Sequence, residues 1–398
     1  MMMKVPAEEI AGRLVTFQAL LAKAGIDGAI IRQNSDLYYF TGTVQDAHLL
    51  VPAQGRPVFM VRRDVGRAEA QSPLRPIVAM KSMQEIRPAM FEACSDPSPR
   101  RIGMELDVIP ANTFFLFDEK LFPRQEIVDI SEIVRQMRTV KSPWEVEMMR
   151  SAASIATVVA EAVPGLLREG VTEYELNAEL ALVARRAGDI GALRFRAFNR
   201  EMPFGHILSG PEAAMPSYMD APTGGPGLSP AFGQGSGSRR IGRGEVVSVD
   251  VMVSHHGYLN DQTRNYCIGS PPRELAEAYR FIRVIHERFK EAAKPGAACE
   301  DLYNLVWKWV SEEGRAEHFM GASEPRITFV GHGIGLEVDE YPFIAKGQKL
   351  KLEEGMTIAF EPKFIVPGLG IVGLENTYLV TGSGLESLNA ASEEMVIV

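Results

Sequence analysis

The chain has 398 residues and a formal net charge of −9. Its length exceeds that of one ordinary hydrophobic core, so we expect two domains. Nucleic acid is excluded as the main partner, because binding to phosphates needs clustered Lys and Arg and the sequence has no long basic run. A membrane partner is excluded too, since no apolar run is long enough to span a bilayer.

Cysteine usage and the N-terminal residues bear on the compartment. Cys94, Cys267 and Cys299 are odd in number and far apart, which is typical of free thiols rather than of a disulfide framework or a zinc finger. The first residues, 1–6, lack the apolar stretch of a secretory signal. We therefore expect a cytoplasmic protein.

The first third of the chain alternates strand-like and helical segments. An amphipathic helix is predicted over 7–24, followed by a polar turn around Asn34 and Ser35. Strand-like segments lie at 28–31, 49–61 (two strands around a turn), 77–80, 101–106 and 126–130, and helical stretches lie at 83–94 and 111–121. This alternation predicts an α/β domain that ends near residue 135.

A second domain begins where helix-start signals gather. The sequence Ser142-Pro143-Trp144-Glu145 combines an N-cap serine, a proline at the first helical position and a capping-box glutamate. It predicts a helix that runs to about Ala162 and ends before Pro164. Further helices are predicted over 172–186, 273–293 and 299–312. The stretch 216–244 is dense in Gly, Pro and Ser, which predicts a long loop of the kind that is usually functional or mobile.

A predicted hairpin over 245–268 sets two aspartates face to face. If His255 and His256 form its turn, Asp250 lies directly opposite Asp261. Like charges at such a pair are destabilising, because the Cβ atoms are only about 5 Å apart. A shared cation is the simplest reason for two facing aspartates in a Val-rich sheet.

A second hairpin repeats this arrangement near the C-terminus. Strands are predicted over 357–364 and 371–380, and their register reflects about Gly368. This register places Glu361 opposite Glu375. Two hairpins that each present two facing acids indicate a cation site built from four carboxylates.

One histidine supplies a nitrogen ligand. His332 stands in Gly331-His332-Gly333-Ile334-Gly335, where the glycines let the backbone approach closely and leave the imidazole little cover. Carboxylates with a single imidazole suit Mn, Co, Fe or Zn. We therefore predict two divalent metal ions on Asp250, Asp261, His332, Glu361 and Glu375, able to activate water for hydrolysis.

These residues match a known family. From about Lys141 onward the chain resembles the pita-bread metallopeptidases, which include prolidase, Xaa-Pro aminopeptidase and methionine aminopeptidase. The matching segments are Val249-Asp250, Asn260-Asp261-Gln262-Thr263-Arg264, Gly331 to Val338, Phe360-Glu361-Pro362 and Glu375-Asn376-Thr377. The resemblance implies that all five ligand positions are filled by the expected residue types.

The earlier part of the chain resembles the creatinase/prolidase N-terminal domain, through Asn34 to Gly42 and Arg138 to Ser142. The two resemblances together imply a ribonuclease H-like α/β domain with a mixed sheet over 1–138. An α+β pita-bread catalytic domain follows over 139–398. They also imply a homodimer that acts on a short peptide or another small molecule, most directly as an Xaa-Pro dipeptidase or aminopeptidase.

Some positions depart from the family pattern, and they lie around the substrate rather than the metal. Asp339 and Ser217 stand where the peptidases usually carry histidines that hold the scissile carbonyl and the oxyanion. The usual arginine two residues before the last glutamate is replaced by Gly373. Residues 222–240 form an insertion relative to the short prolidases. His206 is a candidate for a missing donor, and Glu361 for the proton shuttle.

Alternative functions stay open at this point. Creatinase hydrolyses an amidino compound, and a dimethylsulfoniopropionate lyase of similar fold uses an aspartate as its base, a role that Asp339 would fill. A non-catalytic binding module is a third alternative, against which the full ligand set argues. Fold alone does not decide among them.

Overall fold

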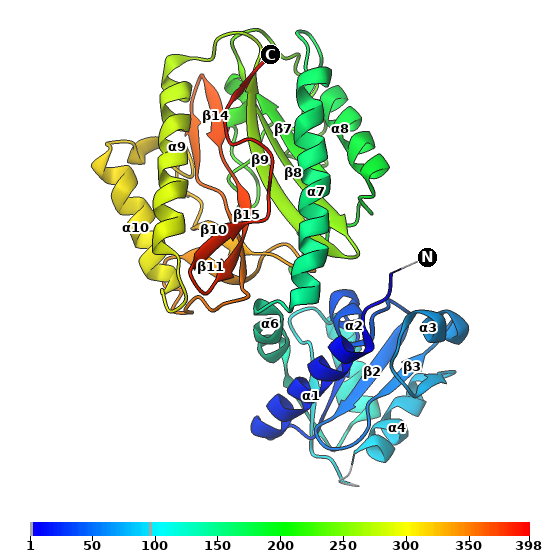
Figure 1. The fold of residues 1–398 in the computed structure, drawn as a ribbon. Helices are drawn as coiled ribbons and strands as arrows, with labels where there is room; N and C mark the ends of the chain where they lie inside the picture. The colour runs from blue at the N-terminus through cyan, green and yellow to red at the C-terminus, as the bar shows by residue number, and fades with distance from the viewer. Residues whose placement is uncertain (1–2, 95–97) are drawn as a thin grey trace. The chain divides into compact units, whose positions relative to one another are not determined.

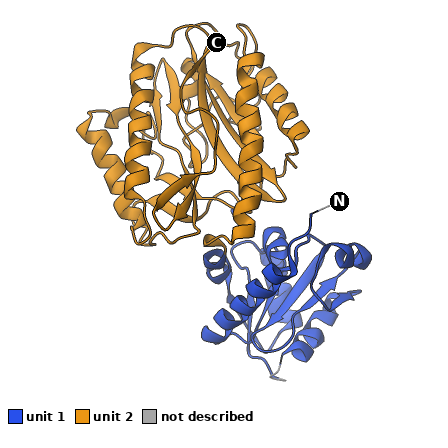
Figure 2. Cartoon of the chain, in the orientation of Figure 1, with its two compact units in different colours: residues 1–137, 196–198 blue, residues 138–195, 199–398 orange. Residues whose placement is uncertain are grey.

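The computed structural model describes residues 3–94 and 98–398. By their internal contacts the residues form two compact units, Met1–Met137 with Arg196–Phe198 and Arg138–Phe195 with Asn199–Val398 (Figure 2). The short return of 196–198 to the first unit has a visible cause, since Arg196 pairs with Asp36 at 2.6 Å and with Asp107 at 2.7 Å. Sequence patterns gave no sign of this return.

The first unit is an α/β domain with one mixed sheet. Its strands are β1 Gly28–Ile31, β2 Ala47–Pro52, β3 Val58–Val61, β4 Ile77–Ala79, β5 Arg101–Met104 and β6 Glu126–Asp129, in the order β4-β3-β2-β1-β5-β6. The central strand β1 is antiparallel to β2 and parallel to β5, as a mixed sheet requires. The helices are α1 Ala7–Lys23, α2 Asn34–Thr41, α3 Val65–Gln71, α4 Ile86–Ala93, α5 Ala111–Phe115 and α6 Ser131–Thr139.

The polar turn predicted at Asn34 is wrong, because helix α2 begins there. The side chain of Gln33 accepts a hydrogen bond from the backbone N–H of Asp36 and so caps the helix start. Glutamine is an uncommon cap, which is why the sequence gave no start signal. Gly42 ends the helix with a left-handed φ of 75°.

The second unit has the pita-bread arrangement, with strands between two groups of helices (Figure 1). Its helices are α7 Pro143–Leu166, α8 Glu173–Ala187, α9 Arg273–Ala292 and α10 Cys299–Glu312. Its strands are β7 Gly205–Ser209, β8 Val246–His255, β9 Tyr258–Cys267, β10 Phe329–Gly333, β11 Glu340–Ala345, β12 Thr357–Phe360, β13 Lys363–Val366, β14 Gly370–Gly373, β15 Asn376–Thr381, β16 Gly384–Ser387 and β17 Val396–Ile397. They form sheets ordered β11-β10-β12-β15-β16, β17-β9-β8-β7 and β13-β14.

Two apolar cores flank these strands. One core joins α7 and α8 to β7, β8 and β9, and it includes Val247, Val249, Val251 and Val253 of β8. The other joins α9 and α10 to the later strands. Because side chains alternate along a strand, the even-numbered residues of β8, Asp250 among them, point away from the first core. The alternation thus leaves a polar layer between the cores.

Helix α7 runs one turn further than predicted, to Leu166, with Pro164 inside it. A proline there removes the N–H that would bond the carbonyl of Ala160, four residues earlier. The hydroxyl of Tyr266 on β9 donates to that carbonyl at 2.8 Å. A tertiary hydrogen bond therefore replaces the lost helical one, which local sequence signals could not reveal.

The register predicted for the first hairpin is wrong by two residues. Asp250 pairs with Thr263, and Asp261 pairs with Met252, because the turn is formed by His256 and Gly257. Both turn residues have positive φ, 48° and 85°, as a type I′ turn requires. A shift of two keeps every side chain on its face of the sheet, so the two aspartates still share one face.

The register predicted for the second hairpin is confirmed, although its strands are broken. Phe360 pairs with Asn376 and Lys363 pairs with Gly373, and both pairings reflect about residue 368. Between these pairs the hairpin leaves the sheet of β12 and β15 and enters that of β13 and β14. Glu361 and Glu375 lie at this break. Neither of the two strand ladders pairs them, so the backbone there can direct both carboxylates toward the other predicted ligands.

The Gly-rich stretch is a loop, as predicted, and its inner part is packed and hydrogen-bonded. The backbone N–H of Gly225 bonds the carbonyl of Met215 at 3.0 Å, and that of Gly227 bonds Gly235 at 3.0 Å. A Cβ on Gly224 would lie within 2.4 Å of backbone atoms, so only glycine fits there. The packing fixes Thr223, which is buried beside β7 and β8.

Candidate metal centre

The five predicted ligands come from five different stretches of the second unit and meet in its polar layer. Asp250 lies on β8, Asp261 on β9 and His332 on β10, while Glu361 follows β12 and Glu375 precedes β15. A backbone bridge between Thr263 and Glu375 ties the two hairpins together. The side chains of His332, Glu361 and Glu375 are no more than 6% exposed.

Unpaired carboxylate oxygens show that a cation fits this cluster. Ligand atoms of Asp261, His332 and Glu375 lie within 4.8 Å of one another. Among the described residues, no hydrogen-bond donor reaches Asp261 Oδ1 or Glu375 Oε1, although both atoms are buried. Buried charged oxygens without partners are costly, and a metal ion removes that cost. The donor set of carboxylates and one imidazole fits a divalent ion.

The ring orientation of His332 also suits a ligand. Its Nδ1 lies 3.0 Å from the carbonyl oxygen of Gly333, which can only accept, so Nδ1 carries the hydrogen. This bond leaves Nε2, which lies 3.6 Å from Glu361 Oε1, with the lone pair that a metal takes. A donor bond from the far nitrogen is the usual way in which a ligand histidine is oriented.

A lysine that sequence reasoning missed lies within the carboxylate cluster. Lys363 is fully buried, and its Nζ donates to Glu361 Oε2 at 2.7 Å, Asp250 Oδ2 at 3.1 Å and Glu375 Oε2 at 3.2 Å. The predicted register of the second hairpin contained the signal, since it already paired Lys363 with Gly373.

The electrostatics of the cluster favour added positive charge. Burial raises the pKa of Asp261 well above its ordinary value, and the neighbouring Glu375 and Asp250 raise it further. Burial also raises the pKa of Glu375 to about 7. For Asp250, burial alone would raise the pKa, but Lys363 and His206 together lower it. One ammonium thus offsets only part of the negative charge.

His206 is linked to Asp250, one of the predicted ligands, by two hydrogen bonds that pass through Thr223. Thr223 Oγ1 donates to Asp250 Oδ2 at 3.0 Å, so its oxygen accepts from Nδ1 of His206 at 2.9 Å. Burial lowers the pKa of His206 to about 4, which keeps the ring neutral near pH 7. The buried Nε2 therefore bears a lone pair, and it has no hydrogen-bond partner among the described residues. In this state His206 is an acceptor rather than the donor that the sequence suggested.

Asp339 also lies at the site, but it is paired. Its Oδ2 accepts a hydrogen bond from Arg200, and its Oδ1 lies 3.7 Å from Nδ1 of His332. Its backbone has a positive φ of 64°, which aspartate tolerates better than most residues. A carboxylate engaged by a guanidinium is a poor free base, so the lyase-like role of Asp339 gains no support.

Ser217 is not brought to the metal centre. Its hydroxyl bonds Gln234 Oε1 at 2.6 Å and accepts from the backbone N–H of Met219. It lies on a neighbouring hollow formed with 321–328 instead. The site pocket is lined by the metal cluster together with Phe195, Arg200, Met202, His206, Met219, Asp220, Thr223, Phe329 and Asp339. Arg200 is the only Lys or Arg among the described residues that line this pocket.

Comparison with known proteins places the chain in a family. The profile of metallopeptidase family M24 matches residues 147–382, and that of the creatinase/prolidase N-terminal domain matches residues 13–140. An Xaa-Pro dipeptidase of Pyrococcus furiosus is 26% identical over 386 residues, covering 96% of this chain and 99% of that protein.

Solved structures agree over the whole chain. The prolidase of Pyrococcus horikoshii has a TM-score of 0.81 at 25% identity and covers 97% of this chain and 100% of its own. An Xaa-Pro dipeptidase of Bacillus anthracis has a TM-score of 0.83 at 24% identity, with 98% and 100% covered. The ligand cluster, the pita-bread fold and the profile match lead to one conclusion: the chain belongs to metallopeptidase family M24 and is a metal-dependent hydrolase.

Proposed function

We propose that this protein hydrolyses short peptides at an Xaa-Pro bond, as a dipeptidase or aminopeptidase. The observation that carries the proposal is the pair of buried oxygens, Asp261 Oδ1 and Glu375 Oε1, which no donor of the described residues reaches and which lie beside His332 in the site pocket. Relatives named Xaa-Pro dipeptidase that cover nearly the whole chain support the choice of substrate.

We further propose that Asp250, Asp261, His332, Glu361 and Glu375 hold two divalent ions, drawn from Mn, Co, Fe or Zn. Such ions polarise the scissile carbonyl and activate water for attack on it. Glu361 would carry a proton from the attacking water to the leaving nitrogen. Its Oε2 is held by Lys363, and its Oε1 faces His332 at 3.6 Å.

Arg200 is the proposed anchor for the substrate. A dipeptide brings a carboxylate into a pocket lined by acids, and the guanidinium of Arg200 is the cation on that described lining. The Arg200 side chain is 33% exposed, so its guanidinium can donate hydrogen bonds to a second carboxylate besides that of Asp339. His206 would accept a hydrogen bond from the substrate through Nε2, instead of replacing the missing histidine donors.

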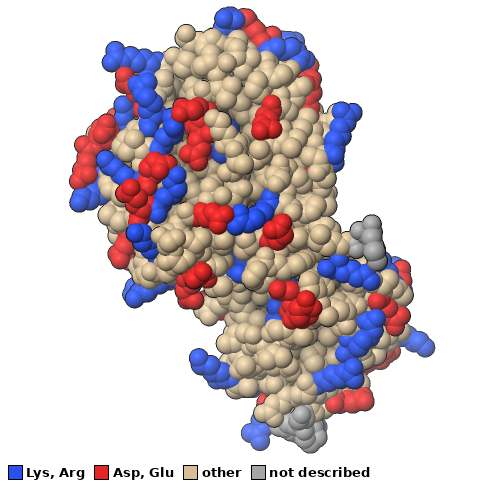
Figure 3. Space-filling view, viewed as in Figure 1, with Lys and Arg blue, Asp and Glu red and all other residues tan. Residues whose placement is uncertain are grey.

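Assembly and compartment are proposed on separate grounds. The family resemblance supports a homodimer. The three cysteines, Cys94, Cys267 and Cys299, are buried thiols, which supports a reducing compartment such as the cytoplasm. Across the described residues, no helix has the length and apolarity needed to cross a membrane. Acidic and basic side chains are interspersed on the face in Figure 3, which supports a partner other than nucleic acid.

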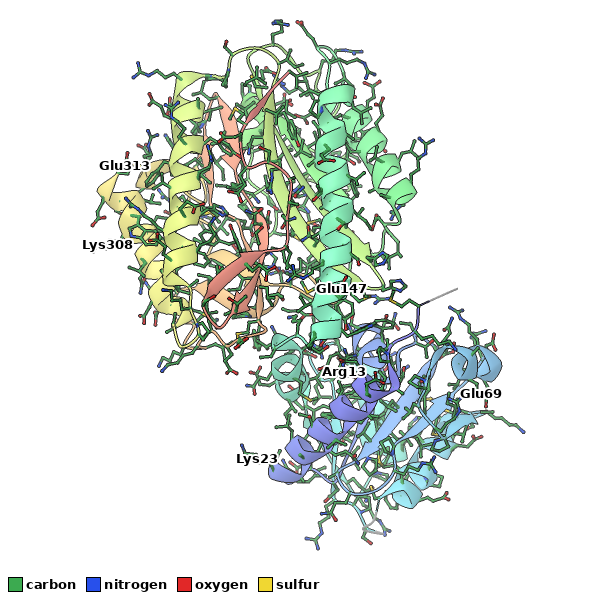
Figure 4. The ribbon with its side chains drawn as sticks, viewed as in Figure 1. Arg13, Lys23, Glu69, Glu147, Lys308 and Glu313 are labelled. Atoms are coloured by element: carbon green, nitrogen blue, oxygen red, sulfur yellow. The ribbon has the colours of Figure 1, made fainter. Side chains whose placement is uncertain are left out.

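The test is turnover of Xaa-Pro dipeptides and longer peptides with Mn, Co, Zn or Fe supplied. We expect proline-containing dipeptides to be cleaved, and Asp261→Asn to lose at least roughly a thousandfold in kcat/KM because one of the proposed metal ligands would be weakened. Glu313→Gln, an exposed acid on the α10 side of the molecule (Figure 4), is the matched control. No turnover of any proline peptide by fully metallated protein would sink the proposal.

A further inference from the structure

Lys363 is the buried charge that the proposed reaction does not use. It begins β13, two residues after Glu361, and its side chain is 0% exposed. A lysine is rarely buried this completely unless its charge is paired. Its burial among the predicted ligands therefore requires a reason.

The contacts of Lys363 account for its entire hydrogen-bonding capacity. An ammonium has three donors and no acceptor. Its Nζ contacts three carboxylates on three different stretches, Asp250 at 3.1 Å, Glu361 at 2.7 Å and Glu375 at 3.2 Å. A single side chain thus holds one aspartate of the first hairpin against both glutamates of the second.

The aliphatic part of the Lys363 side chain passes over Gly373, the residue opposite it on β14, to reach the three carboxylates. Lys363 pairs directly with Gly373 in the β13–β14 ladder. A Cβ built on Gly373 would lie no more than 3.1 Å from three carbons of the Lys363 stem. Positions 363 and 373 therefore share one side-chain space, which only one of them can fill.

Position 373 is also where the chain departs from the sequence pattern of its family, with glycine in place of an arginine. The long cationic side chain of this ladder pair stands on β13, and the glycine that makes room for it stands on β14.

We propose that Lys363 is a positioning residue of the metal centre, which places a cation among its carboxylates from β13, across Gly373. It holds Asp250, Glu361 and Glu375 in place as ligands and offsets their mutual repulsion. The proposal rests on the metal centre described under the proposed function, but not on the identity of the substrate.

The first test separates the charge of Lys363 from its packing. Lys363→Met keeps an unbranched stem over Gly373 and removes the ammonium, and Lys308→Met on the exposed face of α10 is the matched control (Figure 4). We expect metal-free Lys363→Met to melt below the unmodified protein. Saturating Mn²⁺ should then raise its melting temperature roughly twice as much, because the ions replace the missing positive charge. Equal shifts in both proteins would mean that Lys363 only fills space.

The second test exchanges the two residues. Lys363→Gly leaves the acids without their cation, and Gly373→Arg crowds the space that the lysine stem occupies, so we expect both to lose stability in the metal-free state, as Lys363→Met does. The double variant Lys363→Gly/Gly373→Arg should regain it and bind Mn²⁺ within about tenfold of the unmodified protein by calorimetry. A double variant no better than either single variant would overturn the proposal.

Metal binding and melting need no substrate, so these outcomes are independent of peptide turnover. A positive exchange with no proline-peptide cleavage would keep the role of Lys363 and reject the substrate. Should Lys363→Met fail to fold even with Mn²⁺, the exchange decides, since recovery in the double variant supports the proposal and continued unfolding contradicts it.

Discussion

At the scale of single residues, the chemistry of this site depends on which side-chain atoms are left available to bind a metal ion or the substrate. His332 gives its Nδ1 hydrogen to the carbonyl of Gly333, and His206 gives its own to Thr223, so both rings keep Nε2 as the lone-pair atom. Asp261 and Glu375 each keep one buried oxygen that has no hydrogen-bond donor within the described part of the chain. Residue types were readable from the sequence, but which atom stays unpaired depends on neighbours that are distant in the chain.

Arg200 gives a prediction at this scale. If it anchors the substrate carboxylate, Arg200→Met should raise KM for an Xaa-Pro dipeptide about tenfold, which is about 1.4 kcal/mol, and leave kcat nearly unchanged. The same peptide with an amidated C-terminus should show little difference between the two proteins. Steady-state kinetics on both substrates measures this, and an equal rise in KM for the amide would count against the anchor.

Thr223 gives a second prediction, because its hydroxyl links His206 to Asp250. Thr223→Val keeps the shape and removes both hydrogen bonds, so the tautomer of His206 is no longer fixed. We expect kcat to fall roughly tenfold to a hundredfold while metal content stays the same. Elemental analysis beside kinetics checks this, and the conservative Thr223→Ser should recover most of the rate.

At the level of elements, the sequence predicted what is local and missed what is tertiary. The capping boxes at Ser142 and Thr172 mark the starts of α7 and α8 because their bonds close within one turn. The register of the first hairpin was missed because two adjacent histidines hide which residue starts the turn. The ligand face survived the error, since a shift of two residues does not change it.

The end of helix α7 provides an element-scale prediction. Tyr266→Phe removes the hydroxyl that bonds the carbonyl of Ala160, and a buried unpaired carbonyl costs about 1–3 kcal/mol of unfolding free energy. Pro164→Ala restores the helical N–H that can bond the same carbonyl. We therefore expect the double variant to be more stable than Tyr266→Phe alone, as measured by urea denaturation. Simple additivity of the two changes would contradict this explanation.

Glu340, the first residue of β11, provides a second prediction at the scale of elements. Arg138 and Lys141 bond its carboxylate at 2.5 and 3.1 Å and outweigh its burial, so its pKa is lowered to about 2. A lowered pKa stabilises the fold above the ordinary value near 4.5, and this stability is lost as the pH falls toward 2. The full contribution is about 3 kcal/mol at neutral pH.

The corresponding variant is Glu340→Gln. It should lower stability at pH 7 by roughly 3 kcal/mol, because two buried cations lose a carboxylate, and flatten the dependence of stability on pH between about 2 and 5. Urea denaturation across that range measures the slope. A slope equal to that of the unmodified protein would show that Glu340 is not the titrating group.

At the level of the whole molecule, both domain types were predictable, because alternating segments and helix caps repeat along the chain. The return of 196–198 to the first unit was not, since it depends on partners of Arg196 that are far away in sequence. The ligands tie together strands of both flanking cores of the second unit. Metal binding should therefore stabilise that unit as a whole.

Chelation tests this coupling. Removing the ions should lower the melting temperature, and adding Mn²⁺ at about 100 times its Kd should return about 2.7 kcal/mol of unfolding free energy. Scanning calorimetry with and without chelator measures the change. An unchanged transition would mean that the cluster contributes nothing to the fold.

Asp261, His332 and Glu375, with Asp250 and Glu361, are the proposed metal ligands on which the function of this protein depends. Elemental analysis of gently purified protein tests this assignment most directly, with Asp261→Asn and the surface variant Glu313→Gln analysed in parallel. We predict bound divalent metal in the unmodified protein and in Glu313→Gln, and a loss of it in Asp261→Asn. Metal-free unmodified protein that also fails to bind added Mn, Co, Fe or Zn would contradict the account.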